Sequence, residues 1–391
     1  MSNRLSAVLA LTVAAALPAD AVDAGFDEAM AHYEKADFAA AAAEFQALVE
    51  NDPSYDYGHF MLGVCRFREN NFDVAIDHLR RAIELESGRF AYHNALATAL
   101  ARTRDYQAAV AALDRAEELA ASDAELFELR KNRGAALAQL GRCAEAVRDL
   151  GQTVNVRPSS GTLLQLGICQ LRLGSTGDAI ATLEQAARTD ARGTASLYLA
   201  DAYLRKARDI ASEGPRRAAF RTAADHARAA TGASPNDASA WNRLGQAEMG
   251  ARQLEQAAAA FQRALQLRAD DCHARINLGR SQLGLGRWHA ASRALTRARR
   301  CAPQSGTVLE ALAFAKLKLG ELNIARTLYQ QAIAKGAGAS ARDGLAAVTA
   351  KLDQRAAEAE VIAEERRAEE EMQRRLSEYE EKRKAYDGDG N

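Results

Sequence analysis

The side chains best suited to chemistry in this sequence are its cysteines and histidines. No two cysteines form the C-x-x-C pair of redox and zinc sites, and no two histidines have the helical spacing of zinc ligands beside a carboxylate. Phosphate-cradling glycine loops and G-x-S-x-G elbows are also missing. The residues are Cys65, Cys143, Cys169, Cys272 and Cys301, with His32, His59, His78, His93, His226, His273 and His289. We find no support for an enzyme, interpret the histidines as surface or packing residues, and expect no cofactor, metal or small-molecule substrate.

Composition favours helices. Alanine is frequent, and leucine, arginine and glutamate are also good helix formers, while no segment alternates as a strand would. The net charge over 391 residues is −1. Phosphate binding needs a large basic excess. We therefore expect an all-α fold and no nucleic-acid partner.

The N-terminus has the layout of a secretory signal peptide. Arg4 precedes an apolar run from Leu5 to Leu17, and small residues follow up to Ala21. We expect residues 1–21 to be a Sec-type signal, with Ala24 as an alternative cleavage point, and the mature protein to be periplasmic or secreted. The run is too short for a permanent span, and no later segment resembles one, so we expect no integral membrane span after signal removal. The alternative is an apolar first helix of the array.

An internal period indicates the architecture. A small residue recurs at steps of 34, 34, 37, 33, 33, 45, 34 and 34 residues. These positions are Ala29, Gly63, Ala97, Gly134, Gly167, Ala200, Gly245, Gly279 and Ala313. Leucine usually stands just before them, and alanine twelve residues after them. This joint register predicts units of two helices joined by a short turn, stacked so that neighbours bury each other's apolar faces.

Each position in the unit has a physical role. Glycines at several turns suit a left-handed helix end, and prolines fall at unit junctions. The turn glycines are Gly141, Gly174, Gly286 and Gly320, and the junction prolines are Pro53, Pro158, Pro235 and Pro303. We expect the small residues to face the alanines of the second helix, and larger residues to fill the space against the next unit. These larger residues are Phe45, Leu79, Leu113, Leu150, Leu183, Phe261, Leu295 and Tyr329.

This spacing resembles the tetratricopeptide repeat family over residues 22–339. The segment AWNRLGQAEMGARQLEQAAAAFQRALQL, with Trp241, Gly245 and Phe261 in the family's slots, resembles it closely. The resemblance implies a right-handed superhelical solenoid of about nine helix-turn-helix units. Repeat one departs from the pattern at Gly25 and Glu28, repeat four carries Arg133 in the leucine slot, and repeat six has extra residues near 205–219 that we expect to lengthen its hairpin.

The C-terminal region changes character after Ala339. Residues 340–352 are amphipathic and predict a helix that caps the array, whereas residues 353–391 are dense in charge and predict a charged helix with a disordered end, DGDGN. A solvated helix is one interpretation of this region. A thin apolar stripe permits the other, a coiled coil with a partner helix, although Glu365 and Arg375 break its heptads. The stripe comprises Val361, Ala368, Met372, Leu376 and Tyr379.

In the family, first helices line a concave face that contacts extended peptides or partner helices. Basic residues occupy a late slot of that face, five positions after the small residue: Arg68, Arg102, Arg172, Arg205 and Lys318. Earlier inner slots hold Asn94, Lys131, Asn132, Asn242, Asn277 and Arg280. Arginine can fork onto a carboxylate, and asparagine can pair with a peptide backbone. These residues suggest a groove for an acidic or C-terminal peptide, and the alternative is a merely solvated face.

Apolar residues fall on or near the same face, and they suggest a partner helix in the groove or burial between neighbouring first helices. They are Phe60, Leu164, Leu197, Ile276 and Phe314.

Cysteine positions within the repeats allow disulfides in an exported protein. Cys272 begins the first helix of repeat eight and Cys301 ends its second helix, and antiparallel helices bring those two ends together. Cys143 and Cys169 lie near the turn ends of adjacent repeats and form a weaker candidate. Cys65 occupies an inward-packing slot, and we expect a buried thiol.

These patterns favour a non-enzymatic adaptor that binds peptide or helical segments of other proteins in the bacterial envelope. One alternative is a membrane-tethered or cytoplasmic assembly factor or co-chaperone whose N-terminus is not cleaved. Another is a carbohydrate- or lipid-active helical protein, but such a cleft would need inward-facing carboxylates or aromatic platforms, which we do not find in the sequence.

Overall fold

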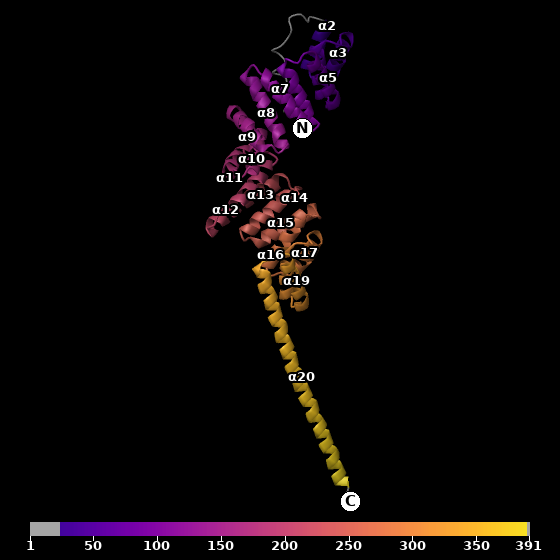
Figure 1. Cartoon of the computed structure of the whole chain (residues 1–391), viewed down its shortest axis with the longest axis vertical. Helices are drawn as coiled ribbons and strands as arrows, with labels where there is room; N and C mark the ends of the chain where they lie inside the picture. The colour runs from indigo at the N-terminus through magenta and orange to yellow at the C-terminus, as the bar shows by residue number, and fades with distance from the viewer. Residues whose placement is uncertain (1–23, 389–391) are drawn as a thin grey trace. The chain divides into compact units, whose positions relative to one another are not determined.

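The computed structural model describes residues 24–388, and over this range the chain forms nineteen helices and no strand (Figure 1). The expected all-α fold of stacked helical hairpins is confirmed. The expected signal peptide at residues 1–21 lies outside the described residues. None of the helices over 24–388 combines the length and the apolarity needed to cross a bilayer.

The chain divides into two compact units, residues 1–209 and 210–391. In the first unit each described helix packs on the next, and one apolar core runs from Phe26 to Cys169. Its hairpins are α2 (Ala24–Glu34) with α3 (Phe38–Asn51), α4 (Asp56–Arg68) with α5 (Phe72–Leu85), α6 (Phe90–Arg102) with α7 (Tyr106–Leu119), α8 (Asp123–Gln139) with α9 (Cys143–Val156), and α10 (Ser160–Arg172) with α11 (Thr176–Ala187), followed by α12 (Thr194–Asp209).

The second unit begins inside the sixth repeat. The division at residue 209 falls where we expected extra residues, and the helix that follows, α13, is 21 residues long. Each helix again packs on the next. The helices are α13 (Glu213–Ala233), α14 (Ala238–Gly250) with α15 (Leu254–Leu267), α16 (Cys272–Gly284) with α17 (Trp288–Cys301), α18 (Gly306–Lys318) with α19 (Leu322–Ala334), and α20 (Ala339–Gly388).

Close helix approach inside each hairpin depends on the recurring small residue. A β-carbon at Gly167 would lie 2.6 Å from Leu183 Cγ, and one at Gly245 would lie 2.6 Å from the Phe261 ring. The large residues that we expected against the next unit therefore lie over the small residue of their own hairpin, because only that position leaves room for them.

Hairpin turns share one backbone feature. The glycines expected to be left-handed have φ between +71° and +85°. Other turns place an ordinary residue in the same conformation: Ala36, Asn70, Arg104 and Arg252, with φ between +59° and +66°. The same turn geometry therefore recurs along the array even where the turn residue is not glycine, and the non-glycine residues adopt it at a modest cost in backbone strain.

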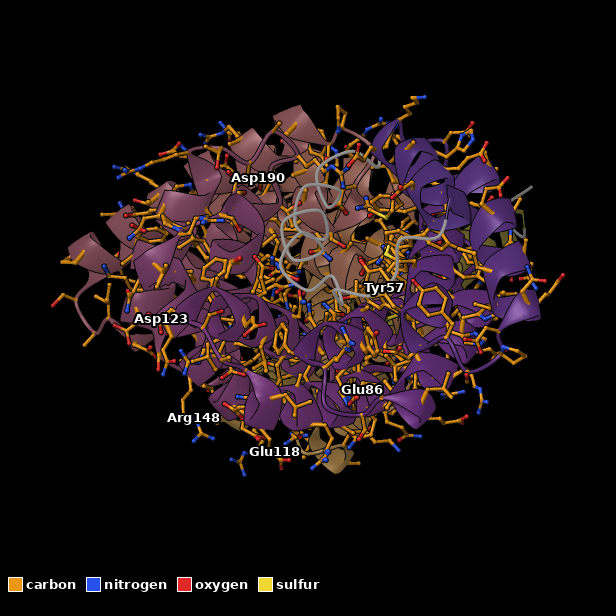
Figure 2. The ribbon with its side chains drawn as sticks, turned by 90° about the horizontal axis from the view of Figure 1, so that it is seen from above. Tyr57, Glu86, Glu118, Asp123, Arg148 and Asp190 are labelled. Carbon is orange, nitrogen blue, oxygen red and sulfur yellow. A yellow bond between two sulfur atoms is a disulfide. The ribbon has the colours of Figure 1, made fainter. Side chains whose placement is uncertain are left out.

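Side chains of the second helices reach the outer surface of the first unit; Glu118 of α7 and Arg148 of α9 point outward (Figure 2). Repeat four places a charge beneath this surface. Arg133 of α8 stands in the leucine slot with a side chain only 14% exposed, and it reaches two neighbouring second helices.

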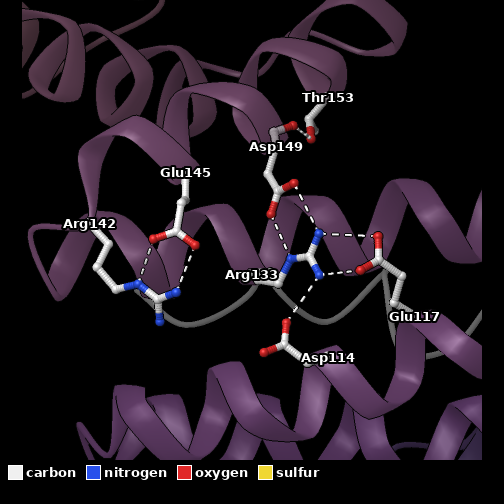
Figure 3. Close-up of polar contacts among 7 residues, drawn as sticks. All are labelled: Asp114, Glu117, Arg133, Arg142, Glu145, Asp149 and Thr153. Carbon is white, nitrogen blue, oxygen red and sulfur yellow. Dashed lines mark hydrogen bonds and ion pairs between the residues drawn. The ribbon is translucent and has the colours of Figure 1, made fainter.

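Arg133 is held by three carboxylates (Figure 3). Its Nε donates to Asp149 Oδ2 at 2.8 Å, its Nη1 donates to Glu117 Oε2 at 2.5 Å, and Nη1 also donates to Asp114 Oδ1 at 3.1 Å. Burial opposes the charge of Arg133, but the hydrogen bonds with Asp149 and Glu117 outweigh it and raise its pKa. The same contact lowers the pKa of Glu117. An ionic cluster therefore replaces the apolar packing found at this position in other repeats.

The C-terminal cap and the charged segment form one helix, α20, rather than two. Its first part docks on the array, since Ala341 and Val348 are fully buried and Gly344 lies against the Tyr329 ring. Residues 353–382 are all exposed, as the solvated-helix interpretation predicts. Of the expected disordered end, residues 387 and 388 belong to α20, and residues 389–391 lie outside the described range.

Candidate peptide-binding groove

The first helices of the first unit form a continuous inner surface. Neighbouring first helices contact each other along α4, α6, α8, α10 and α12. A cavity of ≈ 330 Å³ opens between α4, α6, α7, α8 and α10. Its lining includes Phe67, Thr98, Arg102, Tyr106, Asn132, Gln139 and Gln165. Two residues that the sequence analysis singled out, Arg102 and Asn132, are thus brought to one site.

Asn132 is fixed by a contact between repeats. Its Nδ2 donates to Asn94 Oδ1 at 3.0 Å, and Asn94 is 8% exposed. This pair joins α6 to α8 and orients the Asn132 amide. The Asn132 carbonyl oxygen and its second N–H remain available to a peptide backbone.

Arg102 lies over two aromatic rings. Its Cζ is 4.7 Å from the centroid of Phe72 and 5.7 Å from that of Phe67. The stacking positions the guanidinium, and the side chain makes no hydrogen bond or ion pair within residues 24–388. The edge of the guanidinium can therefore fork onto a carboxylate.

Other late-slot arginines have partners in the array itself. Arg172 Nη1 donates to Ala138 O at 3.2 Å, and Arg205 Nη1 donates to Leu171 O at 2.6 Å. Each of these contacts adds a side-chain donor to a carbonyl at the end of the preceding first helix, which also accepts from the N–H of a turn glycine, Gly141 or Gly174. Arg68 lies 5.5 Å from the Phe38 ring. These three side chains are not gathered around the cavity.

The remaining candidate residues are dispersed. Lys131 is ion-paired with Glu128. In the second unit, Asn242 Nδ2 donates to Asp271 Oδ2 at 3.0 Å, and Asn277 is half-buried on α16.

Arg280 lines a separate cavity of ≈ 670 Å³, together with Phe314 and Lys318. Phe314 is 38% exposed and packs edge-on against Trp288, with the Lys318 Nζ 5.4 Å from its centroid. Phe60, by contrast, is buried and stacks on Tyr92 of the next first helix at 4.7 Å. Of the apolar residues expected near the inner face, Phe314 is therefore exposed and Phe60 buried, while Leu164, Leu197 and Ile276 are half-buried.

Several groove residues were missed from the sequence. Gln139 occupies the late slot of repeat four, and the slot alone could have identified it. Tyr106 begins a second helix, and Gln165 belongs to the next repeat. The cavity therefore combines a second helix with first helices of several repeats, and no pattern read along one helix contains that information.

The cysteines divide into one disulfide and three thiols. The structure joins Cys272 and Cys301, whose Cα atoms are 6.0 Å apart. Cys65, Cys143 and Cys169 are free and buried. Burial raises the pKa of Cys65 to about 12, and burial together with a hydrogen bond to Cys143 does the same for Cys169. Thiols with such pKa values are poor nucleophiles.

Two histidines that we took as unrelated lie together. His59 Nδ1 and His78 Nδ1 are 3.2 Å apart across the α4–α5 hairpin, and His59 Nε2 is 3.3 Å from Pro53 O. Burial lowers the pKa of both rings. Over residues 24–388, no group of three or more His, Cys, Asp or Glu side chains could hold a metal ion.

The geometry is that of a solenoid built from stacked helical hairpins. A tetratricopeptide repeat family model matches residues 26–92, 66–125 and 216–271. These regions of the chain are tetratricopeptide repeats. No curated protein sequence matches.

Solved structures share the fold at low identity. The C-terminal part of a TPR repeat-containing protein from Cytophaga hutchinsonii has 16% identity and a TM-score of 0.50, covering 66% of this chain and 99% of that one. MamA from Desulfovibrio magneticus RS-1 has 22% identity and a TM-score of 0.40, covering 46% and 96%. YrrB, described as a TPR protein with an unusual peptide-binding site, has 15% identity and a TM-score of 0.35, covering 59% and 95%. At 16% identity the first of these structures shows a similar fold and nothing more.

Proposed function

We propose that this protein is a non-enzymatic scaffold that binds an extended segment of a partner protein in the groove between α4 and α10. The observation that carries the proposal is the cavity lined by both Arg102 and Asn132. Arg102 supplies a cation that lies over aromatic rings and has no ion pair within the described residues, and Asn132 supplies an amide oriented by Asn94. Both are typical of sites that recognise peptides, and the tetratricopeptide repeat fold is suited to presenting them on an extended surface.

The groove fits an acidic or C-terminal peptide. A carboxylate of the peptide forks onto Arg102, while its main chain pairs with the amides of Asn132, Gln139 and Gln165. The apolar walls, which include Phe67 and Tyr106, accept a neighbouring apolar side chain.

Photo-crosslinking in cells tests this proposal. A benzoyl-phenylalanine placed at the exposed Gln139 should capture a partner, and the additional change Arg102→Glu should abolish the adduct. A matched control carries the crosslinker at Arg115, which is exposed on α7 and does not line the cavity. Adducts that survive Arg102→Glu, or that form equally from position 115, would refute the proposed groove.

We also propose an envelope location, on the strength of the N-terminal pattern from Arg4 to Ala21. Fractionation followed by N-terminal sequencing of the purified protein tests it. A mature N-terminus after Ala21 or Ala24 in the periplasmic or secreted fraction supports the proposal. An intact Met1 would instead favour a tethered or cytoplasmic assembly factor.

A further inference from the structure

The sequence has a local charge excess that its near-neutral total conceals. Residues 263–300 contain nine arginines and two aspartates, a net charge of +7. Helix α17 and the residue before it contribute five arginines and no acidic residue. Arg287, Arg293, Arg297, Arg299 and Arg300 are all exposed.

Part of this basic surface is hollowed. A cavity of ≈ 240 Å³ lies between α15, α16 and α17, and no acidic side chain lines it. We call it the α17 groove. Its lining consists of Gln262, Leu265, Arg275, Leu278, Gln282, Ala290, Arg293, Ala294 and Arg297.

The first unit contains the same groove with different residues. The cavity around Arg133 is lined from the same repeat positions. Where that cavity has Asp149, Glu117 and Glu145, the α17 groove has Ala294, Leu265 and Ala290, in that order, and Leu278 stands in place of Arg133. The α17 groove therefore lacks the acidic side chains of its counterpart but keeps arginines in its lining, with Arg275 and Arg293 at the positions of Arg130 and Arg148.

The arginines of the α17 groove have unused donors. Arg293 and Arg297 stand one helical turn apart on α17, and neither makes a hydrogen bond or ion pair within the described residues. Arg275 donates to the main-chain carbonyl of Ala269. Gln282 is only 5% exposed, and its Oε1 has no partner in the described part of the chain.

The lining favours a polypeptide over a phosphate-bearing ligand. Leu265 and Leu278 are only half-buried, so an occupant gains by covering them with apolar side chains. The expected occupant is a segment that is both acidic and partly apolar.

The chain itself carries such a segment. Residues 353–381 of α20 contain eleven acidic and five basic residues, and all of them are exposed. Val361, Ile362, Met372 and Leu376 are each more than 50% exposed. Because α20 is one continuous helix anchored at Ala341 and Val348 (Figure 1), this segment cannot return to α17 of its own chain without breaking the helix.

We propose that the α17 groove binds the acidic part of α20 from a second copy of this chain. The carboxylates of that helix pair with Arg293 and Arg297, and its exposed apolar residues cover Leu265 and Leu278. Self-association through this contact is separate from the peptide groove of the first unit.

Sedimentation velocity on the full-length protein tests the proposal. Wild-type protein should associate in a concentration-dependent way, and more weakly at 500 mM than at 50 mM NaCl because salt screens the contact. The double change Arg293→Glu and Arg297→Glu should raise the dissociation constant roughly tenfold or more. The matched control, Arg299→Glu with Arg300→Glu, has the same charge on the same helix but lies outside the groove and should associate nearly as wild type does.

A charge swap completes the test. Protein carrying Glu369→Lys, Glu370→Lys and Glu371→Lys on α20 should lose self-association, and mixing it with the Arg293→Glu/Arg297→Glu protein should restore a complex. Circular dichroism verifies that every variant is folded. Monomeric wild-type protein at both salt concentrations, equal loss in the control variant, or no complex in the mixture would each overturn the proposal. None of these results affects the crosslinking test of the peptide groove.

Discussion

Replacing Arg133 by leucine should destabilise the first unit even though leucine is the usual residue at this position of the repeat. The change removes the cation beside Asp149, whose side chain is 11% exposed. An unpaired buried charge costs about 3–5 kcal/mol, and a newly buried leucine side chain returns about 1.5–3 kcal/mol. We expect Arg133→Leu to lower the free energy of unfolding by about 2 kcal/mol.

The second change, Asp149→Ala, should reverse most of this loss. Alanine already stands at the equivalent positions 112, 260 and 294. The double change Arg133→Leu and Asp149→Ala therefore gives repeat four the apolar packing that other repeats have at these positions. Apolar replacement of a whole buried ion pair is often neutral or stabilising. We expect the double variant to lie within about 1 kcal/mol of wild type, so the effects of the two changes should not be additive.

Urea denaturation followed by far-ultraviolet circular dichroism measures these differences. Hydrogen exchange in peptides from α7 to α9 localises them, and both tryptophans, Trp241 and Trp288, lie in the second unit, so their fluorescence is an internal control. A double variant less stable than Arg133→Leu alone would refute the reasoning.

Acid should remove the advantage of the ionic cluster. Because Arg133 lowers the folded-state pKa of Glu117 below its ordinary 4.5, the stabilisation is present above the unfolded pKa and is lost as the pH falls through the folded one. Below pH 4.5 the wild type should therefore lose stability relative to the double variant, which lacks the cluster.

Three more predictions follow from single contacts. Gly167→Ala should destabilise by about 1–2 kcal/mol in urea denaturation, because overpacking outweighs the gain in helix propensity; an unchanged midpoint would contradict the close helix approach. Reducing the Cys272–Cys301 disulfide should lower the melting temperature, since a cross-link across 29 positions removes about 3.5 kcal/mol of unfolded-chain entropy; two free thiols in native protein would show that it does not form. Since burial lowers the pKa of His59 and His78, stability should fall as the pH drops below their ordinary 6.5, and His78→Ala should reduce that dependence in thermal melts at pH 7.5 and 5.5.

Much of the fold is readable from the sequence because the repeat imposes one steric rule many times. Gly63, Gly167 and Gly279 each admit a leucine of the paired helix at 2.8 Å or less from the place of a β-carbon, and this requirement recurs at a fixed step. Repeat four could be aligned in spite of Arg133, but the sequence does not show its three carboxylates, which come from two neighbouring second helices.

Site residues were harder to predict because each belongs to a surface shared by several hairpins. Asn94 and Asn132 both occupied inner slots, yet their pairing depends on how α6 meets α8. The basic α17 groove escaped notice for another reason. Net charge was averaged over a chain whose acidic residues lie mostly elsewhere, and a local excess of +7 over residues 263–300 does not appear in that average.

One slot shows why residue type alone does not identify a ligand-binding arginine. The late-slot residue lies near the start of the preceding hairpin's second helix, and that residue differs between repeats. Phe72 offers Arg102 a ring, so the guanidinium stacks and keeps its edge free. The helices that precede Arg172 and Arg205 begin with Cys143 and Thr176, which offer no ring.

Those two arginines instead donate to main-chain carbonyls of the preceding repeat. A guanidinium that already donates to the end of a helix has fewer donors left for a ligand. The ability of a late-slot residue to bind a ligand therefore depends on two positions 30 residues apart, a basic side chain and an aromatic ring beneath it. Arg102 with Phe72 meets both conditions, whereas Arg172 and Arg205 meet only the first.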